Sequence, residues 1–367
     1  MPTVRVNIPN SPHDFIIEPG GLESLGQRVR SIAPYGQAML AVDERIAGSH
    51  GRTAARSLSE AGYEVAESRL RAEESRKSLA SVRAMYDEML SARLDRQSPL
   101  IAMGGGIVGD CAGFAAATFM RGVPLIQVPT TLLAMVDASI GGKTGVNLEL
   151  PGGHLGKNLI GAFHQPRLIL ADPRTLLTLN PRDFACGLAE SIKHGLIADR
   201  GLIDFIVGQR DAIEKRDMDV VSQLIERSAR IKIAIVERDE RESGERGLLN
   251  LGHTFAHAIE SFPELQLQHG EAVAIGLRAA SLCTRAMGLL EEAEIDALSH
   301  VIRICNLPDR LPISIETAML MKAMRFDKKS LHGRLRLVLP VARGRCEVVE
   351  GVPDDLIAAA WHEVGAR

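Results

Sequence analysis

Short apolar runs alternate with helical patterns through the first half of the chain. Two segments, 78–91 and 108–119, have the length and apolar spacing of helices that bury one face. Six runs rich in aliphatic and β-branched residues are typical of strands. These runs are 4–8, 38–42, 63–68, 100–103, 125–128 and 168–171. The alternation predicts parallel strands joined by crossover helices, so we expect an α/β domain over residues 1–172.

From residue 173 onward the pattern changes to long helical segments. They are 181–198, 220–237, 248–260 and 271–287. Near the end, two strand-like runs at 334–339 and 346–350 predict a β-hairpin. We therefore expect residues 173–367 to form a second, mostly α-helical domain.

Composition and charge narrow the range of partners. The 367 residues include 43 basic and 46 acidic side chains, for a net charge of −3, and the sequence has no basic block or acidic tail. This balance argues against a nucleic-acid partner. The apolar runs are too short to span a bilayer, and the first residues lack the apolar core of a signal peptide. Five cysteines without a CxxC pair fit a reducing compartment, so we expect a cytoplasmic protein with no membrane partner.

A glycine-rich turn is the first candidate binding site. Gly104, Gly106 and Gly109 fit the pattern G-x-G-x-x-G between a predicted strand and a predicted helix. In this context, glycines let backbone N–H groups approach a pyrophosphate at the positive end of the helix. The acidic residue that usually contacts the ribose about 20 residues later is absent, so Asp43 is the better candidate for that contact. Asp110 lies beside the turn, and a purely structural tight turn remains the open alternative.

Lysine is scarce, which draws attention to the few that are present. Only nine of the 43 basic residues are lysines, and several lie beside glycines or other polar residues. Lys143 follows two glycines, but Asp137 stands where a nucleotide-triphosphate P-loop requires glycine. Lys157 lies in a similar Gly-Lys-Asn segment, next to Asn158. Both lysines are suited to holding a phosphate or a hydroxylated ligand.

Five polar residues recur at helical spacing in the second half of the chain. On one helix they would form a single polar line: Arg246, Asn250, His253, His257 and Glu260. Two histidines one turn apart can ligate one zinc ion, which makes His253 and His257 a candidate pair.

Two further clusters could contribute to a metal site. His269 begins a nearly uninterrupted apolar segment, where a helix dipole would lower the pKa of the imidazole and favour its neutral, metal-binding form. Glu190, Lys193 and His194 form a second set at helical spacing among small and apolar residues. A buried ion pair between Glu190 and Lys193, together with ordinary core histidines, is the structural alternative.

Ordered motifs cover most of the chain and carry a family resemblance. They include Gly-Gly-Gly-Ile-Val-Gly-Asp at 104–110, Val-Pro-Thr-Thr-Leu-Leu at 128–133, Gly-Gly-Lys-Thr-Gly-Val-Asn at 141–147, Gly-Lys-Asn-Leu-Ile-Gly-Ala-Phe at 156–163, Leu-Asn-Leu-Gly-His-Thr at 249–254 and Asp-Lys-Lys at 327–329. In these motifs the chain resembles the 3-dehydroquinate synthase family, within the wider sugar-phosphate cyclases. The resemblance implies an N-terminal Rossmann-like NAD-binding domain, a helical metal- and substrate-binding domain and a homodimer.

The resemblance also implies which residues serve each part of the site. Three would bind zinc or cobalt: Glu190, His253 and His269. Eight would surround NAD: Asp43, Glu74, Lys77, Gly106, Asp110, Thr130, Thr131 and Lys157. Four would bind the substrate: Arg121, reaching across the homodimer, and Asn158, Lys232 and Lys329. Seven residues would form the catalytic set. They would hold the phosphate, carboxylate and hydroxyls of the substrate or belong to the polar network around it: Lys143, Lys193, Arg246, Asn250, His257, Glu242 and Asp137.

The reaction that the resemblance implies belongs to the shikimate pathway of aromatic amino acid biosynthesis. It converts the sugar phosphate 3-deoxy-D-arabino-heptulosonate 7-phosphate to 3-dehydroquinate and phosphate, and NAD is regenerated in each turnover. One departure is the segment 148–154, which adds about five residues between two family motifs at little cost in loop-closure entropy. We expect a surface excursion there, and its effect on Lys157 and Asn158 bears on the choice of substrate. Two alternatives remain open: a related cyclase acting on another heptulose phosphate, and a metal-dependent polyol dehydrogenase that releases NADH.

Overall fold

The computed structural model describes residues 2–150, 155–326, 335–342 and 344–367. The chain divides into two compact units. The first comprises Met1–Leu179 and Val221–Arg241, and the second comprises Asn180–Val220 and Glu242–Arg367.

The first unit extends beyond the predicted boundary at residue 172. The side chain of Asp172 itself accepts a hydrogen bond from the backbone N–H of Gly20 at 2.8 Å, which ties the following segment to the start of the chain. Farther along, the backbone N–H of Asn7 donates to Glu237 of helix α9 (Met218–Arg238) at 2.6 Å. The division in the structure therefore differs from the predicted one, because most of α9 belongs with the first unit.

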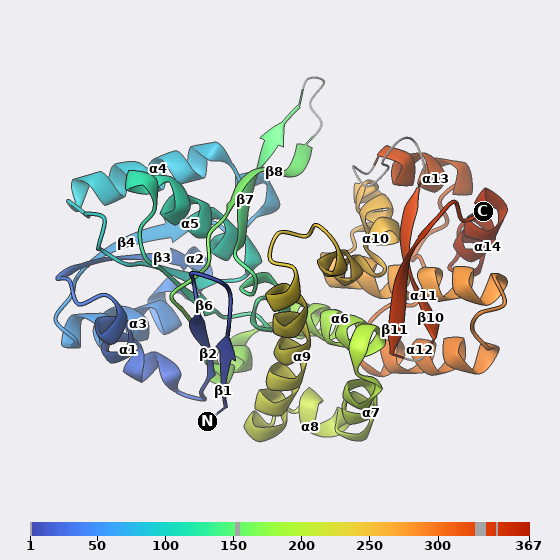
Figure 1. Cartoon of the computed structure of the whole chain (residues 1–367), viewed down its shortest axis with the longest axis horizontal. Helices are drawn as coiled ribbons and strands as arrows, with labels where there is room; N and C mark the ends of the chain where they lie inside the picture. The colour runs from blue at the N-terminus through green and yellow to red at the C-terminus, as the bar shows by residue number, and fades with distance from the viewer. Residues whose placement is uncertain (1, 151–154, 327–334, 343) are drawn as a thin grey trace. The chain divides into compact units, whose positions relative to one another are not determined.

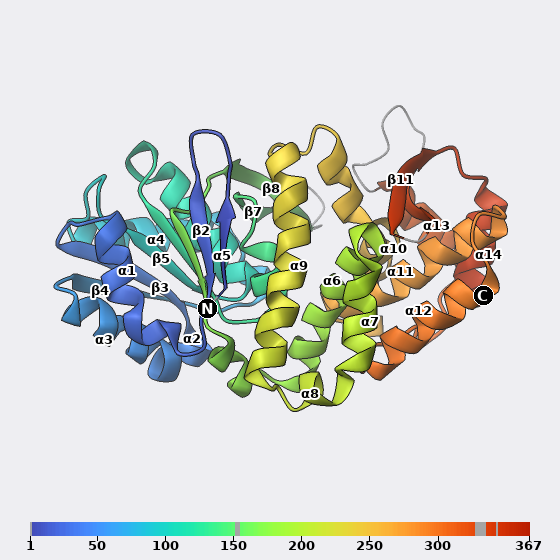
Figure 2. The same ribbon diagram turned by 60° about the horizontal axis from the view of Figure 1, so that its bottom comes forward.

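A seven-stranded sheet forms the centre of the first unit, with strand order β1-β2-β9-β6-β5-β3-β4. Its strands are β1 (Thr3–Val6), β2 (His13–Ile17), β3 (Gln37–Asp43), β4 (Glu64–Leu70), β5 (Leu100–Gly104), β6 (Leu125–Pro129) and β9 (Leu168–Ala171). Neighbouring strands are parallel except for β1, which pairs antiparallel with β2 at one edge (Figure 2). This arrangement confirms the predicted α/β architecture.

Helices cover both faces of this sheet (Figure 1). They are α1 (Leu25–Ile32), α2 (Glu44–Ile46), α3 (Arg52–Glu60), α4 (Leu79–Ser91) and α5 (Gly106–Thr118). Alternate residues of a strand face opposite sides, so Leu40 and Val42 pack with α1 and α3, while Met39 and Ala41 pack with α4 and α5. The central strands β3, β5, β6 and β9 are buried on both faces, so they read as continuous apolar runs, which explains why the sequence predicts them.

Strands β7 (Lys143–Glu149) and β8 (Leu155–Phe163) form a separate antiparallel sheet of two strands. The hydrophobic pattern does not predict them, because glycines and polar residues interrupt the apolar alternation. Glycine at 145 and 161 lets the two backbones approach closely: a Cβ on Gly161 would lie 2.2 Å from the carbonyl oxygen of Thr144. The hairpin extends past the rest of the first unit (Figure 1).

The insertion noted in the sequence falls between β7 and β8, and its described residues are 148–150. Leu148 and Leu150 are each 36% exposed, which agrees with the expected surface excursion. Residues 151–154, the rest of the insertion, lie outside the described residues.

The second unit is mostly helical, as predicted. Its helices are α6 (Pro181–Ala198), α7 (Arg200–Gly208), α8 (Arg210–Glu214), α10 (His253–Glu260), α11 (His269–Ala286), α12 (Glu292–Ile304), α13 (Thr317–Phe326) and α14 (Asp354–Glu363). Strands β10 (Arg336–Ala342) and β11 (Arg345–Glu350) pair antiparallel, which confirms the predicted late hairpin apart from Arg334, outside the described residues. In the core, the ring of Phe255 lies 5.1 Å from that of Trp361. No helix in the described part of the chain is long and apolar enough to cross a membrane.

The predicted helix 248–260 is wrong in its first half. Glu245–Asn250 form a 3₁₀ helix, and α10 begins only at His253. Between the two, Gly252 has a φ of 76°, a conformation that favours glycine. It also packs tightly on α11, since a Cβ on Gly276 would lie 2.2 Å from the carbonyl oxygen of Gly252. The five polar residues from 246 to 260 therefore do not lie on one helix.

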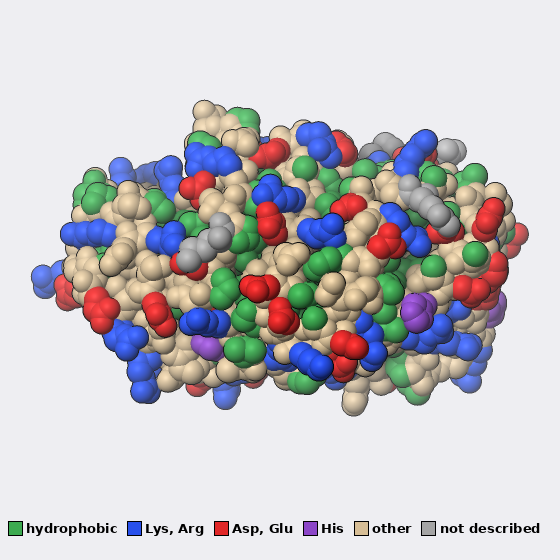
Figure 3. All heavy atoms as spheres, turned by 90° about the horizontal axis from the view of Figure 1, so that it is seen from below, with side chains coloured by type: hydrophobic (Ala, Val, Ile, Leu, Met, Phe, Trp, Pro, Cys, Tyr) green, Lys and Arg blue, Asp and Glu red, His purple; other side chains and the backbone are tan. Residues whose placement is uncertain are grey.

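Charged side chains of both signs are interspersed on the face shown in Figure 3. Neither lysine and arginine nor aspartate and glutamate gather there in a block. The picture agrees with the near balance of 43 basic and 46 acidic residues.

Candidate active site

Three potential metal ligands converge in the second unit. Glu190 comes from the middle of α6, while His253 and His269 are the first residues of α10 and α11. Their donor atoms all lie within 4.8 Å of one another. The Nε2 atoms of both histidines are 3.7 Å from the same carboxylate oxygen, Oε1 of Glu190. Two imidazoles and one carboxylate are the donor set of many catalytic zinc sites, which keep a fourth position open.

Local sequence places both histidines at helix N-termini. His253 follows the chain reversal at Gly252, so the break that removes it from the predicted longer helix also orients it. His269 follows a capping box in which Gln268 and Glu271 exchange side-chain and backbone hydrogen bonds. His257 lies one turn farther along α10, with its ring 5.7 Å from that of His253, and is not part of this donor group.

The Nδ1 atom of each histidine in the donor group is held by a hydrogen-bond acceptor. In His253 it lies 3.1 Å from the carbonyl oxygen of Leu251, and in His269 it lies 2.7 Å from Oε1 of Glu260. An acceptor at Nδ1 fixes the proton there and leaves Nε2 of a neutral imidazole available to a metal ion. Both rings therefore present the nitrogen that faces Glu190.

Charge around this group shifts the two histidines in opposite directions. Burial and the nearby Lys193 ammonium hold the pKa of His253 well below its usual value. Burial also acts to lower the pKa of His269, but hydrogen bonds to the carboxylates of Glu190 and Glu260 outweigh it and raise that pKa to about 10. The expectation that the helix dipole keeps His269 neutral is therefore wrong for the chain alone, since two carboxylates contribute more than one helix end. A cation that binds there releases a proton from His269.

Glu190 also forms the ion pair that the structural alternative proposed. Its carboxylate pairs with the ammonium of Lys193, and both residues are almost completely buried, at 0% and 1% exposure. The ion pair and the metal-ligand group therefore coexist on one carboxylate. A buried ion pair of this kind stabilises the fold little, so a role in the site is the better reason for its presence.

Other predicted residues of the second unit lie on the segment before α10. Arg246 is buried within the 3₁₀ helix, and Nδ2 of Asn250 donates to Oε1 of Glu242 at 2.7 Å. Glu242 has a φ of 57°, so the loop that carries it makes a sharp turn. Lys329 lies outside the described residues.

In the first unit, the glycine-rich turn joins a strand to a helix as predicted. β5 ends at Gly104 and α5 begins at Gly106, with Gly105 as its N-cap. A Cβ on Gly104 would lie 2.8 Å from the side chain of Val108, so the turn admits no larger residue there without a shift. The backbone N–H of Thr130, after β6, donates to the carbonyl of Gly104 at 2.9 Å. The turn therefore lies at the carboxyl ends of two adjacent parallel strands, the usual place for a dinucleotide phosphate.

Two more residues predicted to bind NAD lie near this edge. Thr131 follows Thr130, and its hydroxyl accepts from the backbone N–H of Ala134 at 3.2 Å. Asp43, at the end of β3, accepts from Arg45 through Nε at 3.1 Å and Nη2 at 2.7 Å. The carboxylate that would contact the ribose is thus already fixed in orientation by an exposed arginine.

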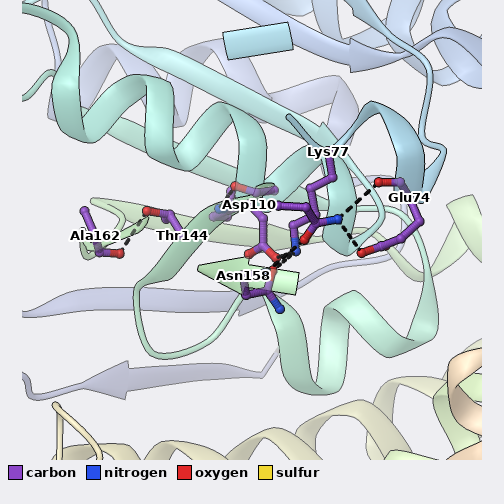
Figure 4. A network of polar contacts seen from close by, with 9 residues as sticks. Glu74, Lys77, Asp110, Thr144, Asn158 and Ala162 are labelled. Atoms are coloured by element: carbon purple, nitrogen blue, oxygen red, sulfur yellow. Dashed lines mark hydrogen bonds and ion pairs between the residues drawn. The ribbon is translucent and has the colours of Figure 1, made fainter. Parts of the chain in front are cut away.

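A polar network connects four predicted residues of the first unit (Figure 4). The ammonium of Lys77 lies 2.5 Å from Oδ2 of Asp110 and 2.5 Å from Oδ1 of Asn158. Burial raises the pKa of the Asp110 carboxyl, although the Lys77 ammonium acts in the opposite direction. Glu74 joins the same network through the side chain of Asn147, at 2.8 Å. Predicted cofactor residues and a predicted substrate residue are therefore in direct contact.

The other lysine and arginine residues predicted for the site in the first unit differ in their surroundings. The ammonium of Lys232, on α9, lies 2.5 Å from the backbone oxygen and 2.8 Å from Oδ1 of Asp137. Arg121 is exposed and has a φ of 67°, between two other residues with positive φ, Met120 and Gly122. Such a conformation costs free energy and often marks a functional turn. Lys143 and Lys157 are exposed on the hairpin strands β7 and β8.

Comparison with known proteins identifies the family. The model of the 3-dehydroquinate synthase N-terminal domain matches residues 67–186, and that of the C-terminal domain matches residues 187–330. The chain belongs to the 3-dehydroquinate synthase family. This confirms the resemblance that the sequence motifs carry.

Individual relatives of the family agree over nearly the whole chain. A 3-dehydroquinate synthase of Crocosphaera subtropica is 39% identical over 364 residues, 98% of each chain. Among solved structures, ValA, a 2-epi-5-epi-valiolone synthase from Streptomyces hygroscopicus subsp. jinggangensis with NAD⁺ and Zn²⁺ bound, is 30% identical. It covers 96% of both chains with a TM-score of 0.85. A 2-deoxy-scyllo-inosose synthase complexed with carbaglucose-6-phosphate, NAD⁺ and Co²⁺ is 25% identical and covers 99% of this chain and all of its own, with a TM-score of 0.88.

Two residues of this family member have contacts that the sequence analysis did not assign. Glu260 was part of the expected polar line but received no role, although it contacts His269. Asn147 was quoted within a family motif, and only the structure shows that its side chain connects Glu74 with Asn158. Their partners lie 9, 73 and 11 positions away in the sequence, so no helical or strand spacing could indicate these contacts.

Proposed function

We propose that the chain catalyses the 3-dehydroquinate synthase reaction, the conversion of 3-deoxy-D-arabino-heptulosonate 7-phosphate to 3-dehydroquinate and inorganic phosphate. In chemical terms it is a carbon–oxygen lyase. The observation that carries the proposal is the convergence of Glu190, His253 and His269 in a chain of this family. The identity of 39% to a 3-dehydroquinate synthase over nearly all of both chains supports the choice of substrate.

The donor set and the glycine-rich turn fit a divalent metal ion and NAD⁺. When bound, these groups supply polarisation of a substrate hydroxyl and a reversible hydride acceptor. Glu190, His253 and His269 would hold the ion, and the backbone of Leu251 and the carboxylate of Glu260 orient the two imidazoles. Lys193 pairs with the buried carboxylate of Glu190 and would help to fix its direction toward the ion.

The cofactor would lie at the carboxyl edge of the sheet. Backbone N–H groups at the start of α5 would face its pyrophosphate, and Asp43 would accept from a ribose hydroxyl. Glu74, Lys77 and Asp110 would complete this side of the site.

Several predicted polar residues would bind the charged groups of the substrate. Arg246 and Asn250 suit a carboxylate, and the hydrogen bond from Asn250 to Glu242 orients the amide. Lys143, Arg121 and Asn158 would hold the phosphate, and His257 would take part in proton movement near the leaving group. We include in the proposal that the protein is cytoplasmic and forms a homodimer, in which Arg121 reaches the partner. Arg121 is exposed on a turn of unusual backbone conformation, which supports this role.

Release of phosphate without net reduction of the cofactor tests this function. Purified protein with the heptulosonate phosphate and trace NAD⁺ should release phosphate far in excess of the cofactor, with no build-up of NADH absorbance. Stoichiometric NADH would support a dehydrogenase instead. Phosphate release from another heptulose phosphate but not from the heptulosonate would support a sister cyclase, the activity class of the ValA neighbour.

A further inference from the structure

Asn147 lies buried where three segments of the first unit meet, with 4% of its surface exposed. It is part of β7, at the point where the register of the hairpin shifts. Its Nδ2 donates to Oε1 of Glu74 at 2.8 Å and to the backbone oxygen of Glu74 at 3.2 Å. Its Oδ1 accepts from the backbone N–H of Asn158 at 2.9 Å, and its own backbone N–H donates to the carbonyl of Lys77 at 2.8 Å.

Each of these contacts fixes a group that the proposed function uses. The bonds to Glu74 hold both its carboxylate and its backbone. The bond to Asn158 holds a residue whose φ is 53°, a left-handed conformation that asparagine tolerates better than most residues. In that conformation Oδ1 of Asn158 reaches the ammonium of Lys77 at 2.5 Å (Figure 4).

We propose that Asn147 is a positioning residue that joins the cofactor-binding segment 74–77 to the substrate-binding Asn158. The inference rests on the proposed function, which supplies the roles of those residues. An amide suits this position because one end donates to a carboxylate while the other accepts from a backbone N–H. An aspartate would place two carboxylates against each other, and an apolar residue would leave the N–H of Asn158 without this acceptor.

The same contact explains how the family insertion can be accommodated. Asn147 and Asn158 flank the segment 148–154, and their hydrogen bond connects the two strands at the register shift, between the pair Val146–Ile160 and the pair Leu148–Gly156. We therefore expect the spacing between the two residues to depend little on the length of the tip, and Asn158 to stay beside Lys77 when the tip changes.

Exchange of donor and acceptor tests the inference. Asn147→Asp keeps the size of the side chain but turns the donor that faces Glu74 into an acceptor. We expect the Kd for NAD⁺, measured by calorimetry, to rise about tenfold or more, and the KM for the heptulosonate phosphate to rise as well, since charge-assisted hydrogen bonds are lost. Adding Glu74→Gln restores a donor opposite the new carboxylate. Because Glu74 is itself a proposed cofactor residue, the double variant is compared with both single variants, and its loss of NAD⁺ affinity should be smaller than the product of the two single losses. A residue that only stabilised the hairpin would show no such coupling.

Thr144→Val provides a matched control in the same hairpin. It removes a cross-strand hydrogen bond, from the Thr144 hydroxyl to the carbonyl of Ala162 at 2.9 Å, that has no part in the network (Figure 4). This variant should bind NAD⁺ within twofold of wild type, and zinc content should be the same in all variants. The inference is overturned if Asn147→Asp binds NAD⁺ within twofold of wild type, if the losses of Asn147→Asp and Glu74→Gln simply multiply in the double variant, or if Thr144→Val causes an equal loss. A wild-type protein that neither binds NAD⁺ nor releases phosphate would instead overturn the proposed function.

Discussion

The polar network around Lys77 and the metal-ligand group around Glu190 are held in place by different forces. In the network, one ammonium pairs with Asp110 and the rest of the contacts come from the uncharged amides of Asn147 and Asn158. In the ligand group, a fully buried carboxylate faces a lysine and two imidazoles. Loss of one amide removes one or two hydrogen bonds of the network, whereas loss of one member of a buried ionic cluster leaves an uncompensated charge.

The behaviour of titratable groups shows the same contrast. In the ligand group, burial and the Lys193 ammonium depress the pKa of His253, whereas hydrogen bonds to two carboxylates raise that of His269 to about 10 in spite of its burial. Strongly perturbed pKa values of this kind cluster at functional sites. We therefore expect substitutions in the ligand group to have larger effects than substitutions in the network.

The largest effect should follow loss of a ligand. His269→Ala and Glu190→Ala should each lose bound metal, because two remaining donors do not hold zinc tightly. His257→Ala should still copurify with about one zinc per chain but lose at least tenfold in turnover, the lower range for a missing proton-transfer group. Metal analysis and phosphate release measure the two effects. A zinc-free His257→Ala together with a zinc-containing His269→Ala would show that the helical pair His253 and His257 binds the metal instead.

A smaller loss should follow removal of the charge that orients His269. Glu260→Gln keeps the size of the side chain but weakens its hydrogen bond to Nδ1 of that histidine. Outer partners of this kind contribute about 10- to 100-fold to metal affinity, so the zinc Kd should rise by that factor in competition with a chelator. Glu264→Gln, on an exposed residue a few positions away, is the control and should leave the Kd unchanged. Equal affinities for the two variants would mean that Glu260 does not support the ligand.

The same contrast between the two regions explains how much could be predicted from the sequence. The central strands β3, β5, β6 and β9 are buried on both faces, so they appear as apolar runs and were predicted nearly to the residue. Strand β2 was not predicted, because it begins with His13 and Asp14 and leaves an apolar run of only three residues. The hairpin β7–β8 was not, because its pairing depends on glycines that allow close backbone approach, such as Gly145 and Gly161. Helix 248–260 was predicted too long because the pattern of polar residues continues through Gly252, where only the packing against α11 breaks the helix.

The site residues divide in the same way. Spacing within one helix indicated Glu190 with Lys193, and the structure shows that ion pair. Spacing could not bring His253 together with His269, since they begin two different helices, and family resemblance supplied that combination. The opposite charge environments of the two histidines depend on side chains from several segments. For that reason the pKa of His269 was predicted in the wrong direction.

Shortening the hairpin tip should have a modest effect, which would sharpen the contrast with the ligand group. Because the bond between Asn147 and Asn158 connects the two strands on the inner side of this segment, deletion of about five residues within 148–154 should leave KM and turnover within about tenfold, or about 1.4 kcal/mol. Steady-state phosphate release measures both constants. A larger loss, or a change in preferred sugar phosphate, would mean that the tip helps to form the site.

The smallest effect concerns the pH dependence of the unfolding free energy. A histidine of the first unit and one of the second should change it in opposite directions. His13, at the start of β2, is 2% exposed, and its burial lowers the pKa of the imidazole. Above pH 6.5, about the pKa of histidine in the unfolded chain, His13 is neutral in both the folded and the unfolded state and does not reduce stability. Below that pH the unfolded chain takes up the proton first, so the free energy of unfolding falls. His13→Asn should therefore reduce the slope of unfolding free energy between pH 7 and 5 by at most one proton, or about 1.4 kcal/mol per pH unit.

Chelator-treated protein allows the opposite case to be measured in the second unit. The pKa of His269 is raised to about 10, so its ion pairs contribute fully below pH 6.5 and lose their contribution as the pH rises toward 10. His269→Gln should accordingly flatten the alkaline side of the stability profile, whereas His13→Asn flattens the acid side. Urea unfolding across pH 5 to 10 distinguishes the two. If both variants changed the same side, the two histidines would not differ in charge environment as the structure shows, and the contrast between the two units would fail.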